Sequence, residues 1–169
     1  MVMIRPEKPE DVTAIHHVNA IAFGQPQEGD LVDGLRLAGA LTISLVAEQD
    51  GRIVGHIAFS PVMITSDTAV VDAIGLAPMA VLPEYQRQGI GSQLVASGLE
   101  ACREMGYGIV VVLGHPNYYP RFGFTPSKPL GVVWEHNAPE EAFMVKELKE
   151  GTLAQTRGVV EYRPEFDMV

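Results

Sequence analysis

The sequence predicts a single α/β domain over residues 1–169, and three observations support this fold class. The length of 169 residues and the hydrophobic content of 47% suit one domain with a sizeable core. A strand over 76–82, a glycine-bearing turn, a helix over 92–105 and an apolar strand over 109–113 follow one another, as in a right-handed crossover. The Asp50-Gly51 pair between two strand-like stretches is a strong hairpin signal.

The first forty residues predict a short strand and two helices. Ile4-Arg5-Pro6 begins the strand, and Pro9-Glu10-Asp11 opens a helix with the proline and acidic residues that a first turn favours. Gly24 is expected to end this helix. A second helix is predicted over 29–37.

Two strands are predicted next, over 41–48 and 52–65. In the second strand, His56 and Ser60 share one face because side chains alternate along a strand. They either face a ligand cleft or form a hydrogen-bonded pair inside the sheet, and the second interpretation is favoured.

A long strand is predicted over 70–82, with a break near Gly75 and Pro78. Proline cannot donate a hydrogen bond to a ladder, so Pro78 argues for a bulge or for a local parting of neighbouring strands. A core strand with a tolerated proline is the alternative.

The remaining chain predicts a strand over 109–113, a short helix over 118–122 and a last strand over 142–148. Residues 158–163 are expected to add an edge strand. Since unpaired strand edges seek partners, a homodimer formed through this edge is a hypothesis.

Charge and composition exclude several classes of function. The formal net charge of −9 argues against a nucleic-acid-binding protein, which needs a basic footprint. No leader pattern or long apolar run is present, so we expect no membrane partner and a cytoplasmic protein. The single Cys102 cannot form an intramolecular disulfide, and we expect it to be a buried apolar residue rather than a nucleophile.

The stretch Gln86-x-x-Gly89-x-Gly91 joins the long strand to the following helix and predicts an anion site. Glycine lets the backbone approach a ligand closely, and the first amides of a helix lie at the positive end of its dipole. Phosphate is the natural ligand of such a site. A plain structural turn is the alternative, and a nucleotide-binding loop is disfavoured because no lysine follows Gly91.

In this context the stretch resembles the acyl-CoA pyrophosphate loop of the GCN5-related N-acetyltransferase (GNAT) family. Tyr119-Pro120-Arg121-Phe122-Gly123-Phe124 is similar to that family's Tyr-x-x-x-Gly-Phe segment, and the chain looks closest to small uncharacterised bacterial members. The resemblance implies a mixed, mostly antiparallel central sheet with a splayed strand pair and flanking helices. It also implies an acetyl-CoA-dependent N-acetyltransferase, with acetyl-CoA as co-substrate and no metal.

The resemblance assigns the donor site residue by residue. The backbone of Met79, Ala80 and Val81 would bind the pantetheine arm as an added strand. The pyrophosphate would be bound by the loop and the helix start, which comprise Arg87, Gln88, Gly89, Ile90, Gly91 and Ser92. Asn117 is a candidate for a further contact with the pantetheine arm.

Tyr119 is the expected catalytic residue, because its spacing to Gly123 matches the family's acid whereas that of Tyr118 does not. Its phenol would protonate the departing thiolate. For the general base the sequence offers four candidates and no geometry to choose among them: Asp72, Glu84, His115 and His56.

We therefore expect transfer of an acetyl group to a primary amine of a small molecule or protein, by direct attack in a ternary complex. No placed nucleophile suggests an acyl-enzyme. The alternative is a non-catalytic acyl-CoA-binding or sensing module. The identity of the acceptor is not encoded in any motif.

Overall fold

The structure is a computed structural model that describes residues 1–169, except for the side chain of Met168. The chain divides into two compact units. Residues 1–60, 77–101 and 164–169 form the first unit, and residues 61–76 and 102–163 form the second.

The first unit contains β1, β2 and parts of β3 and β4, and these strands lie in the order β1-β2-β3-β4. Strand β1 (Val2–Pro6) pairs antiparallel with β2 (Ile43–Gln49), which pairs antiparallel with β3 (Arg52–Thr65). The β2–β3 turn has φ 53° at Asp50 and 76° at Gly51, which is the double left-handed conformation of a tight hairpin. The hairpin prediction is confirmed. Strand β4 (Val70–Val81) lies beside β3.

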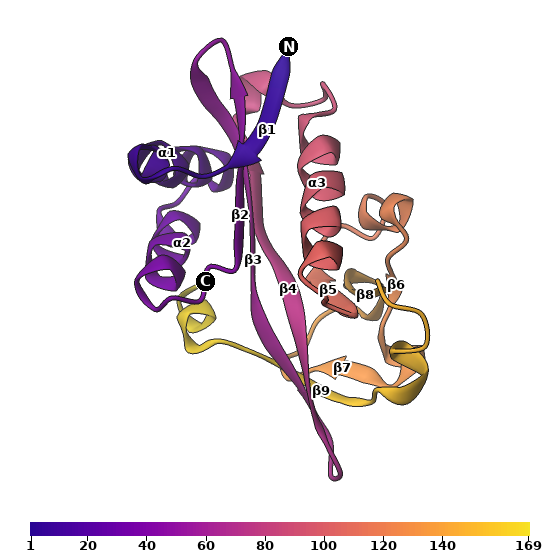
Figure 1. Ribbon diagram of the computed structural model, residues 1–169. Coiled ribbons are helices and arrows are strands. Elements are labelled where there is room, and N and C mark those ends of the chain that lie inside the picture. The colour runs from indigo at the N-terminus through magenta and orange to yellow at the C-terminus, as the bar shows by residue number, and fades with distance from the viewer. The chain divides into compact units, whose positions relative to one another are not determined.

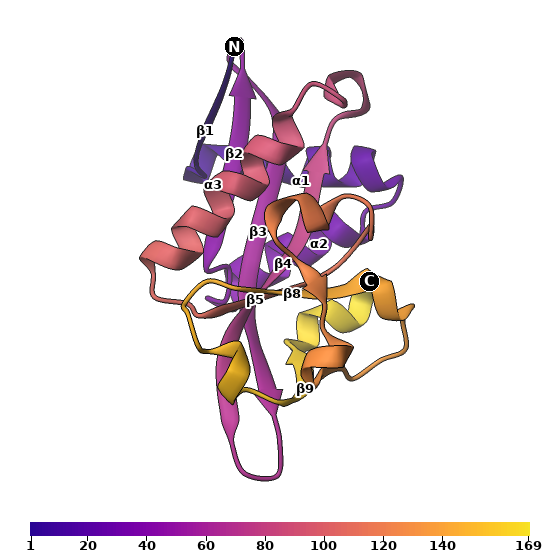
Figure 2. The same ribbon diagram turned by 90° about the vertical axis from the view of Figure 1, so that its right-hand side faces the viewer.

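Three helices flank these strands (Figures 1 and 2). Helices α1 (Val12–Phe23) and α2 (Gln27–Leu37) lie on one face, where Ile15 and Val32 pack against Val46 of β2. Gly24 ends α1 with φ 70°, as predicted. Helix α3 (Ile90–Glu104) lies on the other face, and Gly98 brings it close to Phe59 of β3.

The final segment of the chain returns to α2. Phe166 packs against a buried cluster formed by Leu31, Leu35 and Ala40, and Leu41 also contacts this cluster. Phe166 therefore adds to the apolar packing of the helix.

The second unit pairs its strands in two groups. In one, β5 (Ile109–Leu113) is parallel to β4 and antiparallel to β8 (Phe143–Glu147), which also pairs with β6 (Thr125–Pro126). In the other, β9 (Gly158–Tyr162) lies between β3 and β7 (Val132–Trp134). The buried core of this unit comprises Val62, Ile64, Ala73, Ile109, Val111, Val132, Phe143, Val145 and Val160.

The predicted fold class is confirmed. Only β4–β5 and β7–β9 are parallel among the registers of the described strands, so the pairing is mixed and mostly antiparallel. The β4–β5 register is short and comprises two residue pairs, Ile74–Val110 and Gly75–Val111. Seven short 3₁₀ helices complete the description: Pro9–Asp11, Pro83–Tyr85, Tyr119–Phe122, Lys128–Leu130, Glu140–Ala142, Leu153–Gln155 and Pro164–Met168.

Two sequence predictions are wrong. Strand β4 continues through Gly75 and Pro78 without a break. Gly75 serves close packing instead, since a Cβ there would lie 3.0 Å from Tyr162 and from Val62. Strand β9 is paired on both sides and is not the open edge on which the dimer hypothesis depended. Among the described residues, no helix has the length and apolar character needed to span a membrane.

Candidate donor site and catalytic residues

The predicted phosphate loop lies between the 3₁₀ helix Pro83–Tyr85 and α3, all within the first unit. Arg87 has φ 64° and Gly89 has φ 84°, so the backbone turns sharply twice. A left-handed arginine is uncommon and points to a constrained, functional turn. A Cβ built on Gly89 would meet no atom within 4 Å, which leaves open space beside the loop.

The start of α3 supplies amides that the helix itself does not use. The first helical bond runs from Gln93 N–H to the Gly89 carbonyl at 3.1 Å. The amides of Ile90 and Gly91 precede this ladder and lie at the positive end of the helix dipole. Ile90 is 2% exposed, so its backbone rather than its side chain is available. This arrangement suits a phosphate group.

Along strand β4, some backbone groups face β3 and others face away from it. Leu82 N–H donates to the Val54 carbonyl of β3 at 2.9 Å, and the Ala80 carbonyl also lies close to Gly55 of β3. Because backbone directions alternate along a strand, the groups of Met79 and Val81 face away from β3. These two residues, rather than Ala80, offer backbone groups to an added strand, although the Val81 carbonyl already accepts a hydrogen bond from Gln86.

Gln86 fastens the loop to this strand, a role that the sequence motif did not reveal. Its side-chain amide donates to the Val81 carbonyl at 3.0 Å. The exposed Gln88 reaches back to the Glu84 carbonyl at 3.4 Å, and Ser92 is half-buried in the first turn of α3. Hydrogen bonds from the loop's own side chains therefore stabilise its turns.

The residues fit a pantetheine pyrophosphate ligand. A diphosphate requires space, a tightly turned backbone, unpaired amides and a positive charge. The loop offers the space beside Gly89, its left-handed turns, the first amides of α3 and the guanidinium of Arg87. The outward amides of Met79 and Val81 suit an extended amide-bearing arm. Acetyl-CoA has both parts.

Tyr119 lies in the second unit, at the start of the 3₁₀ helix Tyr119–Phe122. Its side chain is 7% exposed, and its ring makes edge contacts with Tyr118 at 5.1 Å and Phe124 at 5.8 Å. Gly114 abuts the ring so closely that a Cβ there would overlap it. Burial, and to a lesser extent Tyr118, raises the pKa of the Tyr119 hydroxyl above its ordinary value. The phenol is therefore protonated at neutral pH.

The base candidates fall into two classes. Asp72, Glu84 and His115 are exposed, and so is Asn117 in the turn before Tyr119. His56 is fully buried on β3. Its partner is not Ser60, whose hydroxyl has no hydrogen-bond partner among the described residues.

His56 is instead one link in a chain of hydrogen bonds. Asn19 Nδ2 donates to the Ile15 carbonyl at 3.0 Å and to His56 Nδ1 at 3.1 Å. A carbonyl can only accept, which fixes the amide orientation and makes Nδ1 an acceptor. His56 Nε2–H then donates to Ser44 Oγ at 2.8 Å, and Ser44 donates to Glu7. Burial lowers the pKa of His56 to about 3, so the ring is neutral.

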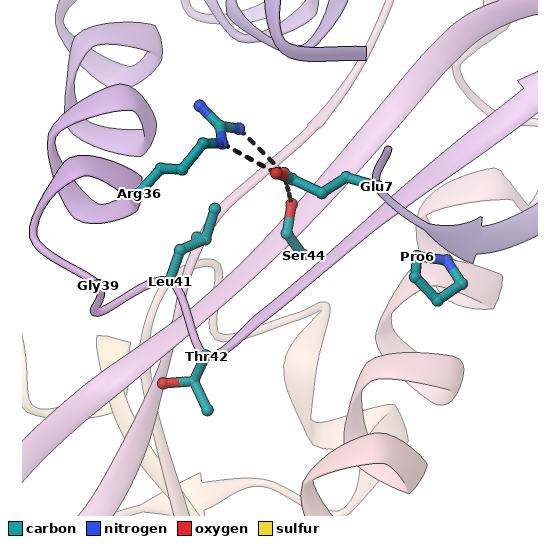
Figure 3. A pocket seen from close by; sticks show the side chains of 7 residues that line it. All are labelled: Pro6, Glu7, Arg36, Gly39, Leu41, Thr42 and Ser44. Atoms are coloured by element: carbon teal, nitrogen blue, oxygen red, sulfur yellow. Dashed lines mark hydrogen bonds and ion pairs between the residues drawn. The ribbon is translucent and has the colours of Figure 1, made fainter. Parts of the chain in front are cut away.

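The chain ends at a pocket of about 300 Å³ in the first unit (Figure 3). Arg36 bonds Glu7 through Nε at 2.8 Å and Nη2 at 2.9 Å, and it bonds Asp33 at 3.0 Å. Although burial raises it, bonds from Arg36 and Ser44 hold the pKa of Glu7 below its ordinary value. The pocket is lined by Pro6, Glu7, Arg36, Gly39, Leu41, Thr42 and Ser44. Its charged groups are already paired, so the cluster ties β1, α2 and β2 together.

Comparison with known proteins gives one family. The model of the acetyltransferase (GNAT) domain matches residues 3–127. The chain is 38% identical over 167 residues to a protein of Escherichia coli K12 named Uncharacterized N-acetyltransferase YhbS, covering 98% of this chain and 99% of that protein.

Two solved structures share the fold over nearly the whole chain. The E. coli GNAT family N-acetyltransferase YhbS, crystallised in complex with CoA, has a TM-score of 0.92 at 38% identity and covers 98% of this chain and 92% of that one. A GNAT family acetyltransferase from Brucella melitensis in complex with acetyl-CoA has a TM-score of 0.81 at 39% identity and covers 99% of each chain. The chain belongs to the GCN5-related N-acetyltransferase (GNAT) family.

Proposed function

We propose that the protein transfers the acetyl group of acetyl-CoA to a primary amine of a small molecule or protein, by direct attack in a ternary complex. The observation that carries this proposal is the loop with left-handed Arg87 and Gly89 at the start of α3. The similarity to YhbS spans 98% of the chain, and we accordingly treat residues 1–169 as one acetyltransferase domain.

The donor would be held along β4 and the loop. Met79 and Val81 direct their backbone groups away from β3 and would bond the pantetheine arm, and Ala80 would line it. The pyrophosphate would be held by the loop and helix start, from Arg87 to Ser92. Bound there, acetyl-CoA supplies an activated thioester carbonyl.

The chain's own chemistry would be proton transfer at Tyr119. A buried, protonated phenol can donate its proton to the departing thiolate sulfur. Direct transfer to the amine is favoured over an acyl-enzyme because the single cysteine, Cys102, is buried, and burial raises the pKa of its thiol to about 12. An amine acceptor is cationic before it reacts, and the acidic protein with net charge −9 favours its approach.

Thermal unfolding with and without acetyl-CoA tests donor binding. Ligand at about 100 times its dissociation constant stabilises the native state by about 2.7 kcal/mol, which raises the midpoint by about 5 to 10 °C in a protein of this size. Gly89→Asp places a negative charge where the phosphates would lie, and it should abolish this shift. Release of free thiol in the presence of a panel of amines then measures turnover.

Gly89→Asn is the matched control, because it adds a side chain of the same size without the charge. Asparagine and aspartate both tolerate the left-handed conformation better than other residues. We expect both variants to fold with similar midpoints, and the asparagine variant to keep more of the ligand shift. Equal shifts in wild type and Gly89→Asp would contradict the proposed donor site.

A further inference from the structure

Two arginines of the first unit, Arg5 and Arg36, are held in internal ion pairs, whereas the two arginines near the phosphate loop are not. Arg5 bonds Asp11 at 2.7 Å and Glu48 at 2.8 Å, and Arg36 is held by two carboxylates as described above. Among the described residues, Arg52 and Arg87 have no carboxylate within ion-pair distance. The guanidinium groups of Arg52 and Arg87 therefore have no ionic partner among the described residues.

Arg52 has a defined place near the loop. It is the first residue of β3, and its Cζ lies 5.7 Å from the ring centroid of Tyr85. Tyr85 ends the 3₁₀ helix that leads directly into the loop, and the Leu82–Val54 hydrogen bond of 2.9 Å ties that helix to the start of β3. Arg52 is exposed and Tyr85 is half-buried. An available cation is therefore held over an aromatic ring at the entrance to the loop.

Coenzyme A has one phosphate group more than the proposed pyrophosphate loop would bind. Coenzyme A has a pyrophosphate and a third phosphate on the 3′ position of its ribose. The helix amides and Arg87 suit the pyrophosphate, which leaves the terminal phosphate without a partner in the loop. A phosphate monoester is bound best by a guanidinium fork, and the protein's net charge of −9 makes a local cation necessary.

We propose that Arg52, held over Tyr85, binds the 3′-phosphate of the donor and selects coenzyme A over 3′-dephospho-coenzyme A. This inference rests on the proposed function, because it assumes that acetyl-CoA occupies the loop. Arg52 makes no internal ion pair, so replacing it leaves no carboxylate unpaired.

Calorimetric titration with CoA and with 3′-dephospho-CoA tests the assignment in wild type and Arg52→Gln. We expect wild type to bind CoA about tenfold more tightly than 3′-dephospho-CoA, the effect of one charge-assisted contact. Arg52→Gln should bind CoA about tenfold more weakly and 3′-dephospho-CoA within twofold of wild type. Lys8→Gln is the matched control, because Lys8 is an exposed cation of the same unit at the start of the first helical segment. It should leave the ratio unchanged.

The outcomes separate this inference from the proposed function. Equal binding of the two ligands by wild type, or an equal loss of both in Arg52→Gln, would overturn the Arg52 assignment and leave the donor site standing. A ratio that changes as much in Lys8→Gln would also overturn it, because the effect would then be one of net charge. Failure of wild type to bind either ligand would overturn the proposed function and this inference together.

Discussion

Tyr119 can be buried because the neighbouring Gly114 has no side chain. The ring occupies the space that a Cβ on Gly114 would take, and it is held between Tyr118 and Phe124 by edge contacts. Burial disfavours the phenolate and keeps the proton on the hydroxyl. In the proposed reaction this proton goes to the departing thiolate of the donor.

Tyr119→Phe should therefore lower turnover by about 10²-fold or more while the affinity for acetyl-CoA stays within twofold of wild type. Steady-state thiol release and calorimetric titration measure the two quantities. Tyr118→Phe is the control, since it removes a neighbouring hydroxyl of the same kind. Loss of turnover in Tyr118→Phe instead would reassign the acid, and a wild type without turnover would favour a non-catalytic acyl-CoA-binding module.

At the level of elements, α3 carries the amides that we propose bind the pyrophosphate, and the packing of α3 on β3 sets where they lie. The helix approaches the sheet closely at Gly98, where a Cβ would overlap the ring of Phe59. Phe59 is fully buried, and side chains in a close-packed core have little room to move. The glycine in α2 has different surroundings, because a Cβ on Gly34 would make ordinary contact with Glu165 at 3.6 Å.

The two glycines form a matched pair for mutation. Gly98→Ala should destabilise the protein by about 1 to 3 kcal/mol because it overpacks the contact between α3 and β3. Gly34→Ala should stabilise it by up to about 1 kcal/mol, since alanine favours the helix and meets no obstacle. Urea unfolding gives both values. A neutral Gly98→Ala would show that α3 can shift away from the sheet without cost.

Across the whole molecule, a buried neutral histidine couples stability to pH. His56 joins α1 through Asn19 and β2 through Ser44, so both ring nitrogens already take part in hydrogen bonds. Its pKa is lowered by burial from an ordinary 6.5 to about 3. Between these values the unfolded chain binds a proton that the folded chain does not, so unfolding takes up a proton and stability falls as pH decreases.

The slope of this loss is about 1.4 kcal/mol per pH unit for one histidine. We expect this loss of stability between pH 6.5 and 5. Glu7 and Asp11 contribute only at lower pH, because their pKa values are lowered from the ordinary 4.5 and 3.8. Urea midpoints at pH 7, 6 and 5 measure the effect. His56→Gln should be less stable at pH 7 but lose the slope, whereas an unchanged slope would assign the proton to another group.

Sequence patterns predicted the features that depend on neighbouring residues. The bounds of β3, the Asp50-Gly51 turn and the stop at Gly24 follow from side-chain alternation and backbone preference. The pairing of β9 between β3 and β7 depends on contacts between distant segments, and a three-residue strand such as β7 carries too little pattern to detect.

The candidate site also has features that the sequence predicts and features that it does not. The loop motif located Arg87 and Gly89 because glycine spacing marks a turn, and the structure gives both residues positive φ. The pairing of Glu7 with Arg36, 29 residues apart, had no local signal. The predicted break near Gly75 is wrong because sequence alone does not distinguish a flexible glycine from one that accommodates a neighbouring ring.

The contact of Phe166 with α2 has a consequence for synthesis on the ribosome. Leu31, Leu35 and Ala40 leave the ribosome long before Phe166 is made. The 126 residues from Ala40 to Phe166 take roughly 6 to 25 seconds at typical rates of translation of about 5 to 20 residues per second. For that interval the apolar cluster of α2 lacks its last partner and is open to chaperones. The helix pair therefore reaches its final packing only after Phe166 itself has left the ribosome.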